Sequence, residues 1–176
     1  MSEESENNES AMSLNDVGAS ENLGGDTLQF LTFAVEGSEY GVDIMRVMEI
    51  RGWSETTRIP NSPDHMRGVI NLRGLVIPIF DLRTRFGQGV TEATEKHVVI
   101  VIKVGERTIG ILVDAVSDIL TVGEHEVKSA PSSADTGIDD AYVNGLISVD
   151  EKMVVLLDVD YLFDVETLKQ AEEVAA

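Results

Sequence analysis

The feature that most constrains this chain is an internal repeat, visible as two blocks of matching positions. Placing Tyr40-Gly41-Val42 over Ile109-Gly110-Ile111 needs a shift of 69 positions, and placing Gly68-Val69-Ile70 over Gly145-Leu146-Ile147 needs a shift of 77. The further matches are Val47 with Val116, Glu49 with Asp118, Ile50 with Ile119, Ile77 with Val154, Ile79 with Leu156, Asp81 with Asp158 and Phe86 with Phe163. Apolar hairpins resemble one another by chance, but the recurring Asp and Phe spacing favours a true duplication.

Each copy is expected to contain about five short strands, and a sheet that small has exposed edges unless it curls closed. The repeat therefore predicts a mostly all-β fold of two small five-stranded barrels, with short helices and a C-terminal helix. The expected division is a tail at 1–26, a domain at 27–165 and a C-terminal helix or tail at 166–176. The domain would hold two interleaved barrel subdomains, with hairpin blocks at about 28–95 and 96–164. A groove between two barrels is a common place for a partner or ligand.

The strongest hairpin signal lies at residues 68–82, where two β-branched arms flank Arg73-Gly74. Gly74 can adopt positive φ without steric cost, and Pro78 is expected near an edge or a bulge because it donates no ladder hydrogen bond. Arg73 is either an ordinary solvated turn residue or a recognition residue presented to a partner. The second copy has Asp150-Glu151 at this turn, so the second hairpin cannot do in the same way whatever Arg73 does in the first.

Other elements follow from β-branched runs and capping residues. Asp43 is expected to cap a helical turn, and Asp81 and Asp158 read as repeated helix caps. Further strands are predicted at Leu28–Val35, Thr56–Pro60, Lys96–Val104, Thr108–Val113, Tyr142–Val149 and Met153–Val159.

Composition excludes several classes of function. The net charge of −19 argues against nucleic acid and anionic lipid as partners, because both need a cationic face. No stretch approaches the roughly 18 apolar residues of a membrane span, and no secretory signal is evident. The chain has no cysteine, which excludes disulfides and thiolate sites and fits a reducing cytosol. Residues 1–26 contain seven acids and no Lys or Arg, so we expect a disordered tail.

No motif in the sequence predicts catalysis, a metal site or a cofactor. His65, His97 and His125 are far apart in sequence and none has another ligand at helical spacing, so a zinc site has little support. No Gly-rich loop or nucleophile elbow is present, and no pair of acids is positioned by spacing for acid–base work. An enzyme is therefore the weaker hypothesis.

Six segments of the chain closely resemble the CheW family of bacterial chemotaxis coupling proteins, and the resemblance covers about residues 27–165. The combination of the Asn-Leu-Arg-Gly hairpin at 71–74 with Pro78-Ile79-Phe80-Asp81-Leu82 is the most specific part. The remaining segments are Glu39–Ile44, Val47–Gly52, Arg58–Pro60 and Gly110–Leu120.

The resemblance implies two SH3-like barrels, no catalysis and an adaptor role in the cytoplasm at receptor arrays. The partners it implies are the cytoplasmic tip of methyl-accepting chemoreceptors and the regulatory domain of the histidine kinase CheA, with the adaptor monomeric when free. Val47, Glu49, Gly68 and Arg73 match positions tied to receptor and kinase coupling. Val116 and Ile119 match positions of the second barrel that face the receptor groove. Arg73 would pair with a receptor carboxylate, and Glu49 with a basic group.

Two related kinds of protein, and one different class of function, are alternatives to this assignment. CheV-type proteins add a receiver domain and CheA needs hundreds of residues upstream, so neither fits the length of this chain. An adaptor for another chemosensory array stays open. So does a small-molecule binding module that uses the groove between the barrels.

Overall fold

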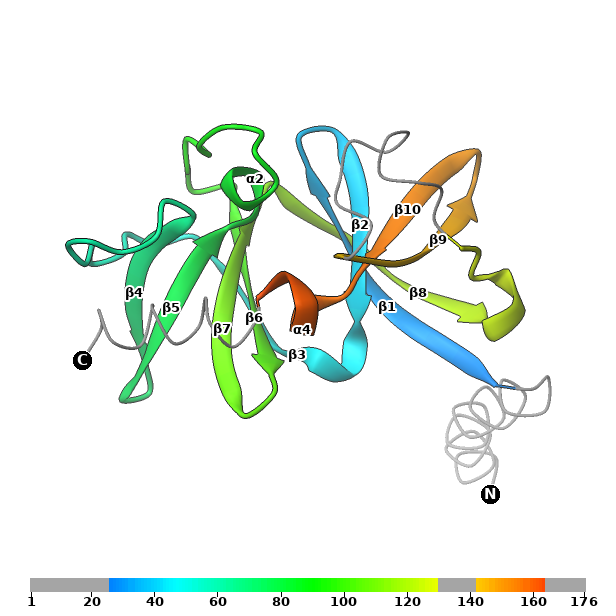
Figure 1. Ribbon diagram of the computed structural model, residues 1–176, viewed down its shortest axis with the longest axis horizontal. Helices are drawn as coiled ribbons and strands as arrows, with labels where there is room; N and C mark the ends of the chain where they lie inside the picture. Colours follow the sequence, from blue (N-terminus) through cyan, green and yellow to red (C-terminus); the bar gives the residue numbers. More distant parts are fainter. Residues whose placement is uncertain (1–25, 130–141, 164–176) are drawn as a thin grey trace, which may run out of the picture.

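The computed structural model contains two five-stranded β-sheets, each curled into an SH3-like barrel, and it describes residues 26–129 and 142–163 (Figure 1). In sheet order, barrel A consists of β8 (Ala115–Gly123), β1 (Thr27–Val35), β2 (Ser38–Asp43), β10 (Lys152–Leu157) and β9 (Val143–Val149). Barrel B consists of β3 (Val47–Gly52), β6 (Val98–Val104), β7 (Arg107–Val113), β5 (Leu75–Asp81) and β4 (Met66–Leu72). The helical turns in the described residues are η1 (Ile44–Arg46), α2 (Leu82–Arg85), η2 (Glu124–Glu126) and α4 (Val159–Leu162). The expected fold class is confirmed.

Each barrel takes strands from both copies of the repeat. The first copy supplies β1 to β5 and the second supplies β6 to β10, so the chain passes from barrel A to barrel B after β2 and returns after β7. When each strand is replaced by its repeat counterpart, the strand order of barrel A becomes that of barrel B. The β2–β10 and β5–β7 pairs are parallel and link strands of different copies. The two copies have therefore exchanged strands.

The largest apolar cluster lies between the two barrels and is shared by them. Its buried members include Leu31, Phe33 and Tyr40 from barrel A, Phe80, Ile100 and Ile111 from barrel B, and Leu162 and Phe163 from the α4 region. Figure 1 shows α4 lying at the front between the barrels. Burial of this much apolar surface stabilises the contact between the barrels. The inside of the expected inter-barrel groove is thus packed with side chains, which weakens the small-molecule hypothesis for that location.

A smaller cluster fills each barrel, and the two clusters are built from repeat counterparts. The buried residues are Ile77, Ile79, Val99, Val101 and Leu112 in barrel B, and Val122, Ile147, Val154 and Leu156 in barrel A. Ile77 and Val154 are counterparts, as are Ile79 and Leu156, at the shift of 77 positions. The repeat found in the sequence is therefore a repeat of the barrel interior.

The same device closes each barrel at its seam, where the sheet curls round to meet itself. Thr57 and Val69 form an isolated antiparallel bridge after β3, and Lys128 and Leu146 form the counterpart bridge after β8. In barrel B, Thr57 and Val69 exchange two backbone hydrogen bonds, each 2.9 Å long. One bridge at each seam reduces the exposed sheet edge.

The predicted caps are present. The side chain of Asp81 accepts a hydrogen bond from the Arg83 amide, that of Asp158 from the Tyr161 amide, and that of Asp43 from the Met45 amide. Asp81 and Asp158 also donate their own amides to the His65 and Tyr142 carbonyls, which are again 77 positions apart.

One local expectation is wrong, and a second is confirmed. Thr56–Pro60 is not a strand, because only Thr57 pairs, through the seam bridge. Pro78 lies in β5, which is flanked by β4 and β7, and it is next to the bulge of the β4–β5 pair, so the expected position near an edge or a bulge is confirmed. Proline is tolerated there because the pairing of β5 with β7 begins one residue later, at Ile79. The expected tail and C-terminal helix, at 1–26 and 166–176, fall almost wholly outside the described residues.

Candidate protein-interaction surface

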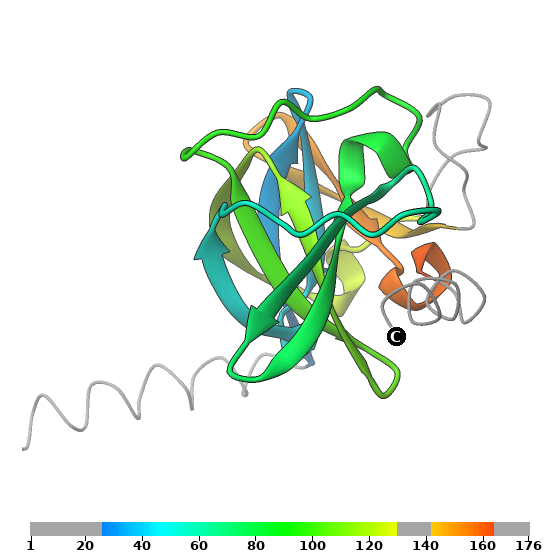
Figure 2. The same cartoon turned by 90° about the vertical axis from the view of Figure 1, so that its left-hand side faces the viewer.

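The β4–β5 hairpin presents Arg73 on a tight turn at the end of barrel B, the side facing the viewer in Figure 2. Arg73 and Gly74 both have positive φ, at 52° and 85°, which matches the two-residue turn that suits twisted strands. The Gly74 amide donates to Asn71 Oδ1 over 2.9 Å and so fixes the turn. The backbone of the turn is therefore fixed by this hydrogen bond. The Arg73 side chain extends from the turn and is 78% exposed.

Arg73 forms an ion pair with Glu49 of β3, with 3.2 Å between Nη1 and Oε2. Glu49 is the less exposed partner, at 28%. Each of these residues is expected to have a partner on another protein, whereas in this structure they pair with one another. An exposed pair of this kind contributes at most about 1 kcal/mol to stability, so exchanging it for intermolecular contacts costs little.

Val47 and Val116 occupy counterpart positions at the starts of β3 and β8. Both are half-buried and pack against the apolar cluster between the barrels. Each therefore lies where its strand leaves the barrel junction, Val47 in barrel B and Val116 in barrel A. The six predicted site residues thus form two groups: Val47, Glu49, Gly68 and Arg73 in barrel B, and Val116 and Ile119 in barrel A.

Exposed apolar side chains accompany the predicted residues on η1 and β3. Met45 is 85% exposed, Met48 59% and Ile50 46%, and Ile119 on β8 is 53% exposed. Sequence reasoning named Ile119 but not Ile50, although the two are repeat counterparts, and this equivalence was the signal that could have identified it. Large exposed apolar side chains are common on protein-binding surfaces. Ile50 points to the opposite face of β3 from Glu49, because consecutive strand residues alternate in direction.

Gly68 differs from the other predicted site residues because it is buried and acts on the fold. Its φ is +145°, and a Cβ added there would lie 2.5 Å from the Thr57 carbonyl oxygen and 2.8 Å from Thr56 Oγ1. The backbone of β4 therefore meets the seam segment too closely for any side chain. Gly145, its counterpart in barrel A, is crowded in the same way by Val127 and Lys128.

The shifted titratable groups lie away from this surface. Burial, with the nearby Arg85 cation, lowers the pKa of His65, while Asp64 opposes that shift. The His65 ring stacks on Phe80 with 5.5 Å between centroids. Burial raises the pKa of Tyr40. Among the described residues, no three His, Asp or Glu side chains converge as a metal site needs, and no helix is long and apolar enough to cross a membrane.

Comparison with known proteins agrees with this geometry. The family description "CheW-like domain" matches residues 29–167. A chemotaxis protein CheW from Klebsiella aerogenes is 42% identical over 155 residues, which cover 87% of this chain and 93% of that protein. The CheW of Bacillus subtilis is 31% identical and covers 81% of this chain and 91% of its own length.

A solved structure supports the same assignment. The scaffolding protein TtCheW from Thermoanaerobacter tengcongensis superposes with a TM-score of 0.73 and 32% identity, covering 81% of this chain and 91% of that protein. The duplicated barrels, the Asn-Leu-Arg-Gly hairpin and these matches converge. The chain belongs to the family of CheW-like domain proteins.

Proposed function

We propose that this protein is a non-enzymatic chemotaxis adaptor that couples the cytoplasmic tips of methyl-accepting chemoreceptors to the histidine kinase CheA. The observation that carries the proposal is the CheW-like match, which extends over residues 29–167 and includes the hairpin that presents Arg73. The protein would be a monomer in the cytoplasm when free, and it would be recruited to membrane-associated receptor arrays to couple receptor and kinase.

An adaptor must hold two partners at once, and the exchanged repeat supplies two comparable surfaces. β3 and β8 are counterpart edge strands, one in each barrel, and both begin at the junction. Each presents a valine, Val47 or Val116, and an exposed isoleucine, Ile50 or Ile119, at equivalent positions. The Arg73–Glu49 pair occurs beside β3, whereas the other hairpin carries Asp150-Glu151. This difference distinguishes the two surfaces and allows each to select its own partner.

The composition of the β3 surface suits a helical partner. Receptor tips are expected to be helical hairpins, and an amphipathic helix binds through apolar anchors flanked by charges. Met45, Met48 and Ile50 would provide adaptable apolar contacts. The Arg73 guanidinium has five N–H donors, and one accounts for the bond to Glu49. The others are available for a receptor carboxylate, which would set register more than affinity.

Reconstitution of kinase activity tests the proposal. CheA autophosphorylation is measured with receptor signalling fragments, with and without this protein. We expect receptor-dependent stimulation only when all three components are present. Absence of stimulation with matched partners, while the protein is shown to be folded, would rule out the coupling role in that pathway. Partners from each chemosensory system of the host would then separate a flagellar array from another array.

A further inference from the structure

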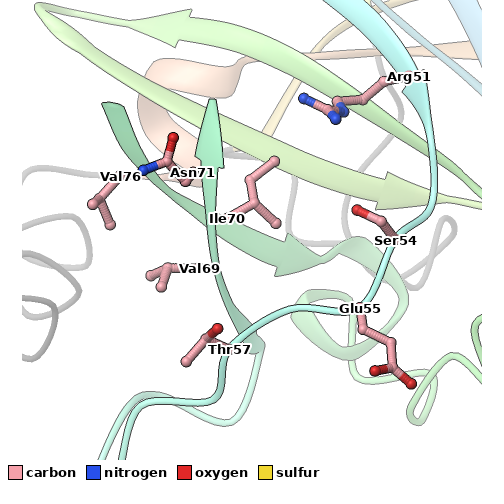
Figure 3. Close-up of a pocket in the computed structure, with 8 residues that line it drawn as sticks. All are labelled: Arg51, Ser54, Glu55, Thr57, Val69, Ile70, Asn71 and Val76. Carbon is pink, nitrogen blue, oxygen red and sulfur yellow. The ribbon is translucent and has the colours of Figure 1, made fainter. Parts of the chain in front are cut away.

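A pocket of about 360 Å³ lies on barrel B at the seam between β3 and β4 (Figure 3). Its lining comes from β3, the segment that follows it, β4 and the start of β5. The lining residues are Arg51, Ser54, Glu55, Thr57, Val69, Ile70, Asn71 and Val76. The seam is bridged at Thr57 and Val69, so the pocket occupies the part of the barrel where β3 and β4 separate.

Arg51 is the unusual member of this lining. It is half-buried, and no hydrogen bond or ion pair joins its side chain to another residue in the described ranges. In Figure 3 its guanidinium extends over Ile70, whereas the carboxylate of Glu55 points away from it. A partly desolvated cation without a partner is costly unless an anion completes the site.

The duplicate barrel provides an internal comparison. Arg51 pairs with Val99 in β3–β6, and the counterpart pair in β8–β1 is Leu120 with Phe30. Leu120 packs against the apolar cluster inside barrel A. The two residues of β4 that line the pocket, Val69 and Ile70, correspond to Leu146 and Ile147, so this part of the lining is apolar in both copies. A leucine therefore suffices to complete the barrel at this position, and barrel B carries an unpaired arginine there instead.

We infer that the seam pocket of barrel B binds a carboxylate carried on a short aliphatic stem. Arg51 receives the carboxylate, Ser54 and Thr57 supply hydroxyl groups, and Val69, Ile70 and Val76 contact the stem. Glu55 lies on the other side of the pocket from Arg51, and its carboxylate would repel a second negative charge on the ligand. The end of the ligand that is remote from the bound carboxylate should therefore be neutral or cationic. The carboxylate belongs either to a small soluble acid or to an acidic side chain of a protein segment. This inference does not depend on the coupling role.

Amide chemical shifts of the full-length protein provide the test. The free probes are pentanoate, 5-aminopentanoate and pentanedioate, and the peptide probes are a blocked peptide with one glutamate and its glutamine twin. We expect saturable shifts at Ser54, Ile70, Asn71 and Val76, with pentanedioate the weakest of the three acids. Tighter binding of the free acids identifies a soluble ligand, and tighter binding of the glutamate peptide identifies a protein side chain.

Arg51→Leu, which installs the residue of the duplicate barrel, should weaken binding by about tenfold or more. Arg58→Leu removes a cation from the same connecting segment outside the pocket and should leave affinity unchanged. Arg51→Gln is the second variant, and spectra away from the seam show whether each variant is folded. The inference is overturned if no probe gives saturable shifts, or if folded Arg51 variants bind as the unaltered protein does. Because kinase coupling is not the readout, either result leaves the proposed function to its own test.

Discussion

Gly68, one of the predicted coupling residues, also has a structural role in the barrel. Gly68→Ala would place a methyl group 2.5 Å from the Thr57 carbonyl at a φ of +145°. We expect a loss of about 2–4 kcal/mol in the free energy of unfolding, because the seam bridge must open to accept the methyl group. Urea denaturation measures this loss.

Gly74→Ala is the matched control for Gly68→Ala. Gly74 also has positive φ, at +85°, but nothing lies within 4 Å of an added Cβ. We expect a loss of about 1 kcal/mol from backbone strain alone. If the two variants were equally stable, crowding at the seam would not explain the glycine at position 68.

The Arg73–Glu49 pair permits a charge-reversal test. Arg73→Glu should leave the protein folded, with a change in stability below about 1 kcal/mol, and should weaken receptor or kinase coupling. The double variant Glu49→Arg with Arg73→Glu restores an internal pair with reversed polarity. Because Arg73 is 78% exposed and is proposed to meet a partner carboxylate, we expect the double variant to remain defective in a ternary-complex assembly assay. Recovery of coupling would instead assign both residues to an internal role.

His65 predicts a pH dependence of stability near neutrality. Its folded pKa lies below the ordinary value of 6.5 because of burial and Arg85. The unfolded chain therefore binds the proton more readily, and stability falls as the pH drops below about 6.5 towards the folded pKa. His65→Phe keeps the stacking on Phe80 and removes the titration. Between pH 7 and about 5.5, the denaturation midpoint should decline less in this variant than in the unaltered protein. An equal decline would show that His65 does not cause the pH dependence.

Individual residues were predicted from sequence when their signal was local. The positive φ at Gly74 and the caps at Asp43, Asp81 and Asp158 are properties of a few adjacent residues, and the structure confirms them. The pairing of Glu49 with Arg73 joins residues 24 positions apart on different strands, and no sequence spacing encodes such a contact. The coupling roles of the six site residues remain predictions.

At the scale of elements, the two copies give a comparison between capping aspartates with different surroundings. Asp81 is fully buried and accepts hydrogen bonds from the Thr91 amide and hydroxyl as well as from the Arg83 amide. Asp158 accepts from the Tyr161 amide. Asp81→Ala should therefore cost about 3 kcal/mol or more, because it leaves buried donors unsatisfied, whereas Asp158→Ala should cost about 1 kcal/mol as an ordinary cap. Chemical denaturation of the two variants measures the difference, and equal losses would contradict it.

Strands and hairpins were predicted well because alternation and turn chemistry are local. The β4–β5 and β9–β10 hairpins and the β-branched strand β6 lie where the sequence indicates. The one failure has its cause in pairing that is set by distant residues. Thr56–Pro60 has a strand-like composition but pairs at one residue, Thr57, through the seam bridge.

At the scale of the whole molecule, the shared apolar cluster predicts one cooperative unfolding transition. Residues from both barrels and from α4 fill that cluster, so opening either barrel would expose the apolar face that the other barrel packs against it. Trp53 fluorescence reports on barrel B, where Trp53 packs against the inner cluster, and far-ultraviolet circular dichroism reports on both sheets. The two thermal transitions should coincide. Leu162→Ala, which removes a side chain with no exposure, should shift both together and cost about 2–5 kcal/mol. Separate transitions would show that the barrels are independent.

The strand exchange itself lies beyond what local patterns encode. Because β1 and β6 are counterparts and so are β2 and β7, the same apolar alternation suits a strand in either barrel. The repeat therefore predicts two similar barrels, whereas tertiary contacts decide which strands each barrel receives.

The exchanged strands also bear on the symmetry of the molecule. Two identical chains that swap strands in this way form a symmetric homodimer, and joining them end to end produces the connectivity seen here. In a homodimer every substitution appears twice. In a single chain the two halves can differ, and this chain has arginine on one hairpin and aspartate on the other, and arginine at one seam and leucine at the other. Because both copies lie in one chain, the molecule has two similar ends that carry different residues, a property that suits the adaptor role proposed for it.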